Sequence, residues 1–382
     1  MTLIATTAMG LESVLKQEVL QLGYKIDNVY DGKVEFEGDL TDICKTNIWL
    51  RTAGRIYIKI ATFKATTFDE LFDKTKQINW HNWIGKNDRF PISKITSRKS
   101  TLFSKSDCQS IVKKAIVSQL QSHYKIHSLP ENEANCAIRI QIENDFVTLS
   151  LDSSGAGLNK RGYRAHMDIA PIRETLAAGL ILLSRWNPTR DILIDPMCGT
   201  GTILIEAGMI AQNIAPGLNR SFASEQWKII PSKLWNNTRQ EAIAAKNNHT
   251  NFTILGSDIN GRSLNIARKN IELANVTNIN VQTLPLSEFN SRHKFGKIIT
   301  NPPYGDRLNQ DINIHDLYTE MGAIFKDNIP DWSYYIITPH EQFEQLFNKK
   351  ATKRRKLFNG NIQCWYYQYF GPKPPRINHL KT

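Results

Sequence analysis

A strand-like run that ends in a glycine turn is the feature of this sequence that most restricts its fold. In ILIDPMCGTGT, the apolar run ends at Asp195, and Gly199 and Gly201 precede an apolar segment that begins near Thr202. Glycines let a ligand approach the backbone, and a helix N-terminus is partly positive. Leu204 replaces the third glycine of the dinucleotide fingerprint, and no Gly-Lys-Ser/Thr follows. A nicotinamide-dependent dehydrogenase is therefore disfavoured, and a P-loop is excluded.

The chain from residue 172 onward alternates between strand-like and helix-like segments. This order is typical of a doubly wound, mostly parallel sheet. A closing hairpin at 354–370, RRKLFNGNIQCWYYQYF, would add an antiparallel edge. The strand candidates of the parallel part are 191–195, 253–258, 278–283, 297–300 and 333–338.

The segment before residue 172 predicts two further α+β regions. Its first part has the order βαββαβ, the ferredoxin-like pattern, with a hairpin around Asp31-Gly32 and a helix capped by Asp39. The next part contains a helix at 108–120 and a hairpin over IRIQIEND and FVTLSLDSS. We expect the boundaries 1–63, 64–155, a linker at 156–171 and 172–382.

Charge and cysteine usage bound the class of protein. The 382 residues carry a net charge of +12, which favours a polyanionic partner such as nucleic acid, although a merely basic soluble protein is an equal alternative. The five scattered cysteines predict neither a disulfide framework nor a zinc site, and they suit a reducing cytoplasm. The N-terminus has no basic leader, and the longest apolar run, 175–183, is too short for a bilayer. We therefore expect no membrane partner and no metal.

A second acid follows the next strand of the parallel sheet. Asp258 ends this strand in GSDIN, where an acid can accept hydrogen bonds from ribose hydroxyls. It lies 258 − 201 = 57 residues after the last glycine, because an insertion at 213–235 separates them. The alternative role is to cap the next helix, for which Asn260 or Ser263 would serve equally well. We favour ribose binding.

The stretch TNPPYGDR predicts a loop that grips an amino group. Pro302 and Pro303 end the preceding strand, because proline has no backbone N–H to donate. The Asn301 side-chain oxygen and the Pro302 carbonyl can each accept one hydrogen of an exocyclic amine. Tyr304, expected to be exposed, offers a stacking face for an extruded base. Asp306 is a candidate proton acceptor, although a turn residue or a partner for Arg307 is the more ordinary role.

Taken together, these motifs resemble those of one enzyme family. DPMCGTGTILIEA looks like the S-adenosylmethionine loop of class I methyltransferases, GSDIN like their ribose acid, and NPPY like the target-base loop of amino-group methyltransferases. With LNKRGYR, APIRETLAA and SRKSTLFSKSD, nearly the whole chain resembles the THUMP-domain RNA guanine-N2 methyltransferases. The likeness is greatest to those that act on bacterial large-subunit (23S) rRNA.

The resemblance implies a fold and an activity. The fold would be a Rossmann-like class I methyltransferase domain preceded by ferredoxin-like and THUMP domains. The enzyme would use S-adenosylmethionine to methylate guanine N2 in structured rRNA in the cytoplasm. Transfer RNA is the nearest alternative substrate, and a non-catalytic RNA-binding ribosome assembly factor is the alternative from another class. A DNA adenine methyltransferase would leave the N-terminal half unexplained. The oligomeric state is not predicted.

The resemblance also implies which residues form the sites. One departure is Pro285, which stands where the family usually has an acid that contacts adenine; the backbone at 284–286 or Glu288 would have to substitute. Glu174 and Thr175 border the cofactor by resemblance, and a helix start is their alternative role. The catalytic set is Asn301, Pro302, Pro303 and Tyr304. The cofactor set is Asp195, Pro196, Cys198, Gly199, Gly201, Thr202, Asp258, Ile259, Glu174 and Thr175.

Basic residues before and within the linker are the candidates for RNA contacts. For any single lysine, a solvated surface position is the more common role. A second basic run, 349–356, precedes the closing hairpin and has the same two interpretations. The candidate RNA-binding set is Arg98, Lys99, Lys105, Lys113, Lys160, Arg161 and Arg164.

Overall fold

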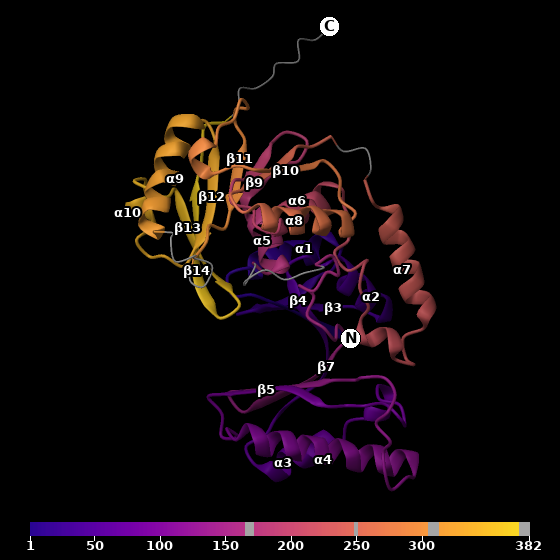
Figure 1. Cartoon of the computed structure of the whole chain (residues 1–382). Coiled ribbons are helices and arrows are strands. Elements are labelled where there is room, and N and C mark those ends of the chain that lie inside the picture. The colour runs from indigo at the N-terminus through magenta and orange to yellow at the C-terminus, as the bar shows by residue number, and fades with distance from the viewer. Residues whose placement is uncertain (165–171, 248–250, 305–312, 374–382) are drawn as a thin grey trace. The chain divides into compact units, whose positions relative to one another are not determined.

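The computed structural model describes residues 1–164, 172–247, 251–304 and 313–373. The chain forms two compact units (Figure 1). The first contains Met1–Thr7, Leu15–Leu158 and Arg220–Ala242, and the second contains Ala8–Val14, Asn159–Asn219 and Ile243–Thr382. Each unit is built on its own seven-stranded sheet.

The beginning of the first unit has the predicted ferredoxin-like order. Its strands lie in the order β2-β3-β1-β4, and all are antiparallel. Asp39 caps α2 by accepting a hydrogen bond from the Asp42 amide at 3.0 Å. The elements are β1 (Thr2–Thr7), α1 (Glu12–Gln21), β2 (Ile26–Tyr30), β3 (Lys33–Glu37), α2 (Leu40–Trp49) and β4 (Ala53–Lys64).

Strand β4 continues the same sheet into the second α+β region. It pairs with β1 on one side and with β7 on the other, so the sheet runs on as β4-β7-β6-β5. Helices α3 and α4 lie on one side of β5 (Figure 1). The elements are α3 (Phe68–Lys76), η1 (Trp80–Asn82), β5 (Ile92–Arg98), α4 (Lys105–Tyr124), β6 (Ile138–Glu143) and β7 (Phe146–Asp152).

The insertion between the glycine turn and Asp258 belongs largely to this first unit. It contains η2 (Ala223–Gln226) and α7 (Ser232–Ala244). The Trp227 indole donates to the Asn135 carbonyl at 3.0 Å, and the Ser224 hydroxyl donates to the Ser153 carbonyl at 2.7 Å. The sequence predicted the insertion but not this packing, because these partners lie 92 and 71 residues away and no local pattern encodes them.

The second unit has the predicted doubly wound sheet with an antiparallel edge. Its strands lie in the order β10-β9-β8-β11-β12-β14-β13; the first five are parallel, and β14 and β13 are antiparallel. The elements are α5 (Glu174–Ser184), β8 (Leu193–Asp195), α6 (Thr202–Ala211), β9 (Ile254–Asp258), α8 (Gly261–Leu273), β10 (Ile279–Thr283), η3 (Leu286–Glu288), β11 (Lys297–Thr300), α9 (Ile314–Asn328), β12 (Ser333–Thr338), α10 (Phe343–Leu346), β13 (Lys353–Asn359) and β14 (Ile362–Tyr369).

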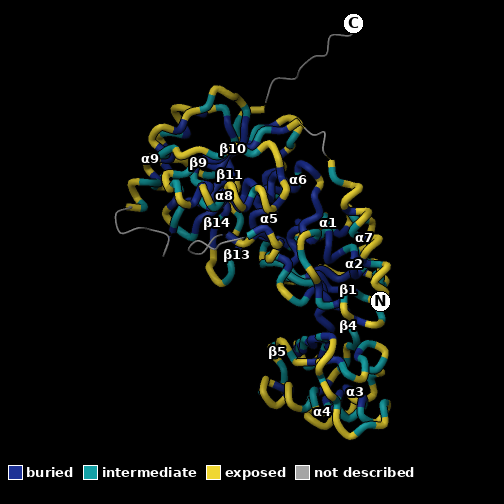
Figure 2. The backbone as a smooth tube through the Cα atoms, turned by 45° about the vertical axis from the view of Figure 1, so that its right-hand side comes forward, coloured by how far each residue is buried: buried dark blue, intermediate teal, exposed yellow. Residues whose placement is uncertain are grey.

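Alternate residues of the central strands point into two different cores. Leu193 and Ile299 pack with α5, α6 and α8 on one face of the sheet. Ile194 and Ile298 pack with α9 and α10 on the other. Because helices cover both faces, the middle residues of the central strands are apolar on both faces, and these strands appear buried in Figure 2. None of the helices in the described ranges is long and apolar enough to cross a membrane.

Candidate active site

Three neighbouring strands of the second unit carry polar residues at their carboxyl ends. Strand β8 ends at Asp195, β9 at Asp258 and β11 at Thr300. Because β9, β8 and β11 are adjacent and parallel, these residues meet at one edge of the sheet. This is the edge at which open α/β sheets bind ligands.

Asp195 is the most buried acid at this edge. Its Oδ1 accepts hydrogen bonds from the Thr300 hydroxyl at 2.7 Å and from the Met197 amide at 3.2 Å. Burial, together with the nearby Asp258 charge, nevertheless raises the pKa of its carboxyl group to about 7. Asp195 therefore ties the glycine turn after β8 to the end of β11.

The glycine turn is shaped by backbone torsion angles that glycine favours. Gly199 has φ +51° and Gly201 has φ +81°. The Gly199 amide donates to Asp258 Oδ2 at 2.8 Å, which joins the turn to the second acid. An added Cβ at Gly199 would meet nothing within 4 Å, whereas one at Gly256 would lie 2.3 Å from a Leu204 methyl carbon. Gly256 thus lets α6 approach the sheet, and Gly199 borders open space.

The helix after Asp258 is capped by another residue. The Asn260 side chain accepts hydrogen bonds from Arg262 at 3.0 Å and Ser263 at 3.3 Å, so Asp258 is not the cap of α8. Its carboxylate instead bonds the Gly199 and Asn260 amides. The neighbouring Ile259 is 71% exposed, an apolar side chain beside the open turn.

Pro285 lies close to the second acid. The Leu284 amide donates to the Asp258 carbonyl at 3.2 Å, so the chain that follows β10 passes beside the end of β9. Leu286 is buried and Glu288 is exposed. The backbone at 284–286 and Glu288 both remain candidates for an adenine contact.

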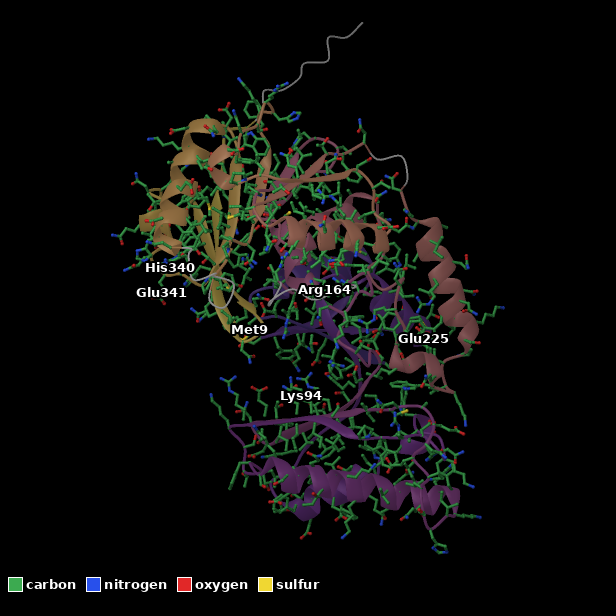
Figure 3. All side chains as sticks on the ribbon, viewed as in Figure 1. Met9, Lys94, Arg164, Glu225, His340 and Glu341 are labelled. Carbon is green, nitrogen blue, oxygen red and sulfur yellow. The ribbon has the colours of Figure 1, made fainter. Side chains whose placement is uncertain are left out.

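Arg164 lies within the second unit, close to α5 (Figure 3). Its Nε is 3.0 Å from Glu174 Oε1, and its Nη2 donates to the Thr202 hydroxyl at 3.1 Å. Glu174 is buried, and burial raises the pKa of its carboxyl group. Arg164 therefore links the first turns of α5 and α6. In the structure the guanidinium group serves these buried partners, and its role as an RNA contact stays a prediction.

Arg161 also has a buried acidic partner, and its role as an RNA contact likewise stays a prediction. It is 3% exposed, and its guanidinium group is paired with Glu206 of α6 at 3.3 and 3.4 Å. The Tyr163 hydroxyl donates to the same carboxylate at 3.1 Å. The sequence LNKRGYR shows a basic run, but the burial of Arg161 depends on a partner 45 residues away.

The NPPY loop follows β11 directly. Asn301 is 8% exposed, and among the described residues no donor bonds its Oδ1. Leaving a buried amide oxygen without a donor costs about 1–3 kcal/mol, which is unusual for a purely structural residue. Pro302 is also buried, and Pro303 is partly exposed. Asp306 and Arg307 lie outside the described residues.

Tyr304 differs from the sequence prediction because it is only 6% exposed. Its ring belongs to the core on the α5 and α6 side of the sheet. The Asn359 side-chain amide Nδ2 donates to the Tyr304 hydroxyl at 3.0 Å. The side-chain oxygen Oδ1 of Asn359 accepts a hydrogen bond from the Arg173 backbone amide at 3.3 Å. Asn359 ends β13, so the closing hairpin connects the NPPY loop to the residue before Glu174. Sequence reasoning assigned Asn359 no role; the motif NGN marked only a turn.

Four further residues of the predicted cofactor set are buried. Pro196, Cys198, Thr202 and Thr175 are buried around the turn. Burial raises the pKa of the Cys198 thiol, which argues against a nucleophilic role. The described ranges contain no group of three or more His, Cys, Asp or Glu residues that could hold a metal ion.

The basic residues fall into two groups. Arg98, Lys99, Lys105 and Lys160 are exposed. Lys113 differs, because its ammonium group lies 2.7 Å from a Glu131 carboxylate oxygen and 3.3 Å from the Phe90 ring centre.

Comparison with known proteins adds family matches over three segments. Residues 161–368 match the family model of the RMKL-like methyltransferase domain. Residues 2–57 match the RlmL ferredoxin-like domain, and residues 65–152 match the THUMP domain.

Full-length relatives share this arrangement. The Bacillus subtilis protein YpsC, whose name describes it as an RNA methyltransferase, is 48% identical over 98% of this chain and 97% of its own length. The Psychromonas ingrahamii ribosomal RNA large subunit methyltransferase K/L is 33% identical over 97% of this chain. The chain spans about half the length of that protein, 50%. The structure of the methyltransferase SMU.472, complexed with SAH, is 39% identical, covers 98% of this chain and 99% of its own, and has a TM-score of 0.89.

Proposed function

Because the chain belongs to the family of RMKL-like methyltransferases, with an RlmL-type ferredoxin-like domain and a THUMP domain, we propose that it methylates the N2 amine of guanine in RNA. The family and the fold predicted from the sequence are thereby confirmed. The methyl donor is S-adenosylmethionine. We further propose large-subunit rRNA as the substrate and the cytoplasm as the location.

The residues of the site fit this cofactor. The space that an added Cβ at Gly199 would enter is open, and the turn leads into the N-terminus of α6. We assign Asp258 to the ribose hydroxyls, Ile259 to the adenine face, and the turn with Asp195, Thr202, Glu174 and Thr175 to the amino acid end. The cofactor supplies an electrophilic methyl group on a sulfonium sulfur. Burial raises the pKa values of Asp195 and Glu174, which disfavours their ionised forms. A cationic group of the cofactor would stabilise the ionised form of both carboxyl groups.

The single observation that carries the reaction is the Asn301 side-chain oxygen, which accepts no hydrogen bond from the residues that the structure describes. A base amine has its lone pair delocalised into the ring, so it must be oriented before it can attack. The Asn301 oxygen would accept one amine hydrogen, and the Pro302 carbonyl would accept the other. This arrangement holds the nitrogen in line and draws its lone pair out of conjugation. Asp306 is a candidate acceptor of the proton that the amine loses, although a turn residue or a partner for Arg307 is its more ordinary role.

Tyr304 needs a modified role. Its burial and its bond to Asn359 hold the loop in place, and stacking on a base would require the ring to be uncovered. We therefore propose that Tyr304, held by Asn359 of the closing hairpin, positions the neighbouring Asn301 in the free protein. Its ring would contact the base only when RNA is bound.

The choice of guanine N2 and of rRNA rests on the family. NPPY by itself serves adenine, guanine and cytosine amines alike, and THUMP-type domains serve both rRNA and tRNA enzymes. What supports rRNA is the likeness of nearly the whole chain to about half of the K/L protein. What supports RNA in general is the THUMP match and the net charge of +12.

The test is methyl transfer from labelled S-adenosylmethionine to total RNA that lacks native methylation at the site. We expect the label in N2-methylguanosine of large-subunit rRNA. The same nucleoside in tRNA would keep the mechanism and change the substrate, and label in adenine would overturn the base assignment. Absence of transfer, together with absence of S-adenosylmethionine binding by calorimetry, would favour a non-catalytic RNA-binding assembly factor.

A further inference from the structure

The most exposed large hydrophobic side chain among the described residues lies in the basic loop between β5 and α4. Phe103 is 80% exposed, although the residue before it, Leu102, is 4% exposed and anchors the loop. Arg98, Lys99 and Lys105 lie in the same short segment and are exposed as well. An aromatic ring surrounded by cations in a loop suits a base and its neighbouring phosphates.

The loop is held in place by a second loop. The Thr101 amide donates to the Asp145 carboxylate at 2.6 Å, and the Asp145 amide donates to the Ser100 hydroxyl at 3.1 Å. The Ser97 hydroxyl donates to the Leu102 carbonyl at 2.7 Å. Phe103 is therefore presented by an ordered backbone, so little entropy is lost when a ligand covers its ring.

The second loop carries another exposed aromatic residue. Phe146, directly after Asp145, is 52% exposed. It is opposite Glu143 on β6 and Lys64 on β4, and Glu143 is opposite Arg98 on β5. Because paired residues point to the same face, these four side chains form a row across the sheet.

This row lies on the face that the helices leave uncovered. Ile138, Ile140 and Ile142 of β6 are buried, whereas Arg139 and Gln141 alternate with them and are accessible. Arg139 is opposite Lys94 of β5, and Figure 3 shows Lys94 on the side of the sheet away from α3 and α4. On the uncovered face, one row of side chains contains the cations Arg139 and Lys94, and the other row ends in Arg98 and Lys64. Hydroxyl and amide groups lie between these two rows. Glu143 is the one acid in these rows.

We propose that this face, Phe146 at its end and the adjoining loop with Phe103 form a docking surface for an unpaired stretch of the RNA substrate, with Phe103 stacking on a base. The uncovered face of β4 to β7, with Phe103 and Phe146, is called the sheet-edge surface below. The cations neutralise phosphates, and the rings supply stacking that paired bases inside a duplex cannot reach. The inference rests on the proposed function, because it assigns the substrate's single-stranded part to this surface.

Phe68 offers a matched control. It is also an exposed phenylalanine of the same unit, 40% accessible, but it is the first residue of α3, on the opposite side of the sheet. Its replacement removes the same kind of ring from a helix on the side of the sheet opposite to the uncovered face (Figure 1).

The experiment measures binding of the full-length protein to a fluorescein-labelled single-stranded RNA of roughly 12 nucleotides and to the same sequence as a duplex. We expect Phe103→Ala to weaken binding of the single strand roughly 5- to 100-fold, as for loss of one base–aromatic stack. The dependence on salt should stay unchanged, because no charge is removed. Phe103→Trp should restore binding, and Phe68→Ala should bind as the wild type does.

Two results would overturn the inference. One is wild-type affinity of Phe103→Ala for the single strand, and the other is an equal loss for single strand and duplex. If the wild type still methylates RNA in either case, only the docking surface is wrong. If the wild type neither binds nor methylates any RNA, the proposed function fails with it.

Discussion

Asn301 is a buried amide whose side-chain oxygen receives no hydrogen bond from the described residues. Asp195 is a buried carboxyl group that accepts two hydrogen bonds and still has a raised pKa. Both arrangements cost stability in the protein alone, and both lie at the same sheet edge. Residues that cost stability where ligands bind are candidates for function.

Replacement of Asn301 by alanine tests its role. We expect Asn301→Ala to lower methyl transfer at least ~100-fold, because one of the two acceptors that orient the amine is lost. Binding of S-adenosylmethionine, measured by calorimetry, should survive. Asn236→Ala, an exposed asparagine on α7, should leave both unchanged. Transfer near the wild-type rate in Asn301→Ala would refute the assignment.

Asp195 predicts a dependence of stability on pH. Burial raises its pKa to about 7, so the folded protein keeps a proton that the unfolded chain loses near its ordinary pKa. The contribution of this group to the free energy of unfolding therefore falls as pH rises from about 4 to about 7, and is smallest above that window. Between about pH 5.5 and 7 the loss is about 2 kcal/mol.

Urea unfolding of the cofactor-free protein measures this contribution. Asp195→Asn keeps the acceptor oxygen for Thr300 and Met197 but cannot ionise. We expect the variant to gain stability relative to the wild type as pH rises from about 5.5 to about 8. A constant difference between the two proteins at both pH values would contradict the raised pKa.

The closing hairpin of β13 and β14 is the element that connects the two halves of the site. Asn359 at its turn bonds the Tyr304 hydroxyl and the Arg173 amide. The adjacent Gly360 has φ +67°, and an added Cβ there would lie 3.3 Å from the Arg173 guanidinium group. The turn is therefore fitted against the start of α5, and the hairpin does more than close the sheet.

A double-mutant cycle tests this connection. Asn359→Ala and Tyr304→Phe should each lower kcat, with a smaller effect on KM for S-adenosylmethionine. Because both remove the same hydrogen bond, the double variant should lose less than the sum, with a coupling energy of about 0.5–1.5 kcal/mol. Gln363→Ala, exposed on the same hairpin, is the control. Strict additivity would show that Asn359 does not act through Tyr304.

For the whole molecule, the net charge of +12 predicts electrostatic binding of RNA. Affinity should fall steeply with salt, since phosphate contacts release counterions. Lys105→Gln should reduce the slope of log affinity against log salt by about 0.7 to 0.9. Lys113→Gln should change it less, because Lys113 is already paired with Glu131. A flat salt dependence of the wild type would remove electrostatic RNA binding from the proposal.

Much of the fold and of the site was predictable from the sequence because it depends on local patterns. The alternation of strand-like and helix-like segments indicated the parallel sheet, and Asp39 indicated a helix start. The proline pair and the glycine turn marked where strands end. Asp195, Asp258 and Asn301 each follow such a strand, and parallel strands end at one edge. Their meeting therefore follows from topology without any knowledge of side-chain packing.

The tertiary structure alone decided how the basic and aromatic residues are used. Arg161 and Arg164 look like surface cations in the sequence but pair with Glu206 and Glu174 inside the second unit. Tyr304 looks exposed and is buried, and Asn359 looks like a turn residue and bonds Tyr304 of the NPPY loop. Burial and partnership depend on residues distant in the chain. A sequence therefore reports that a charge or ring is present, and only the folded chain determines what it contacts.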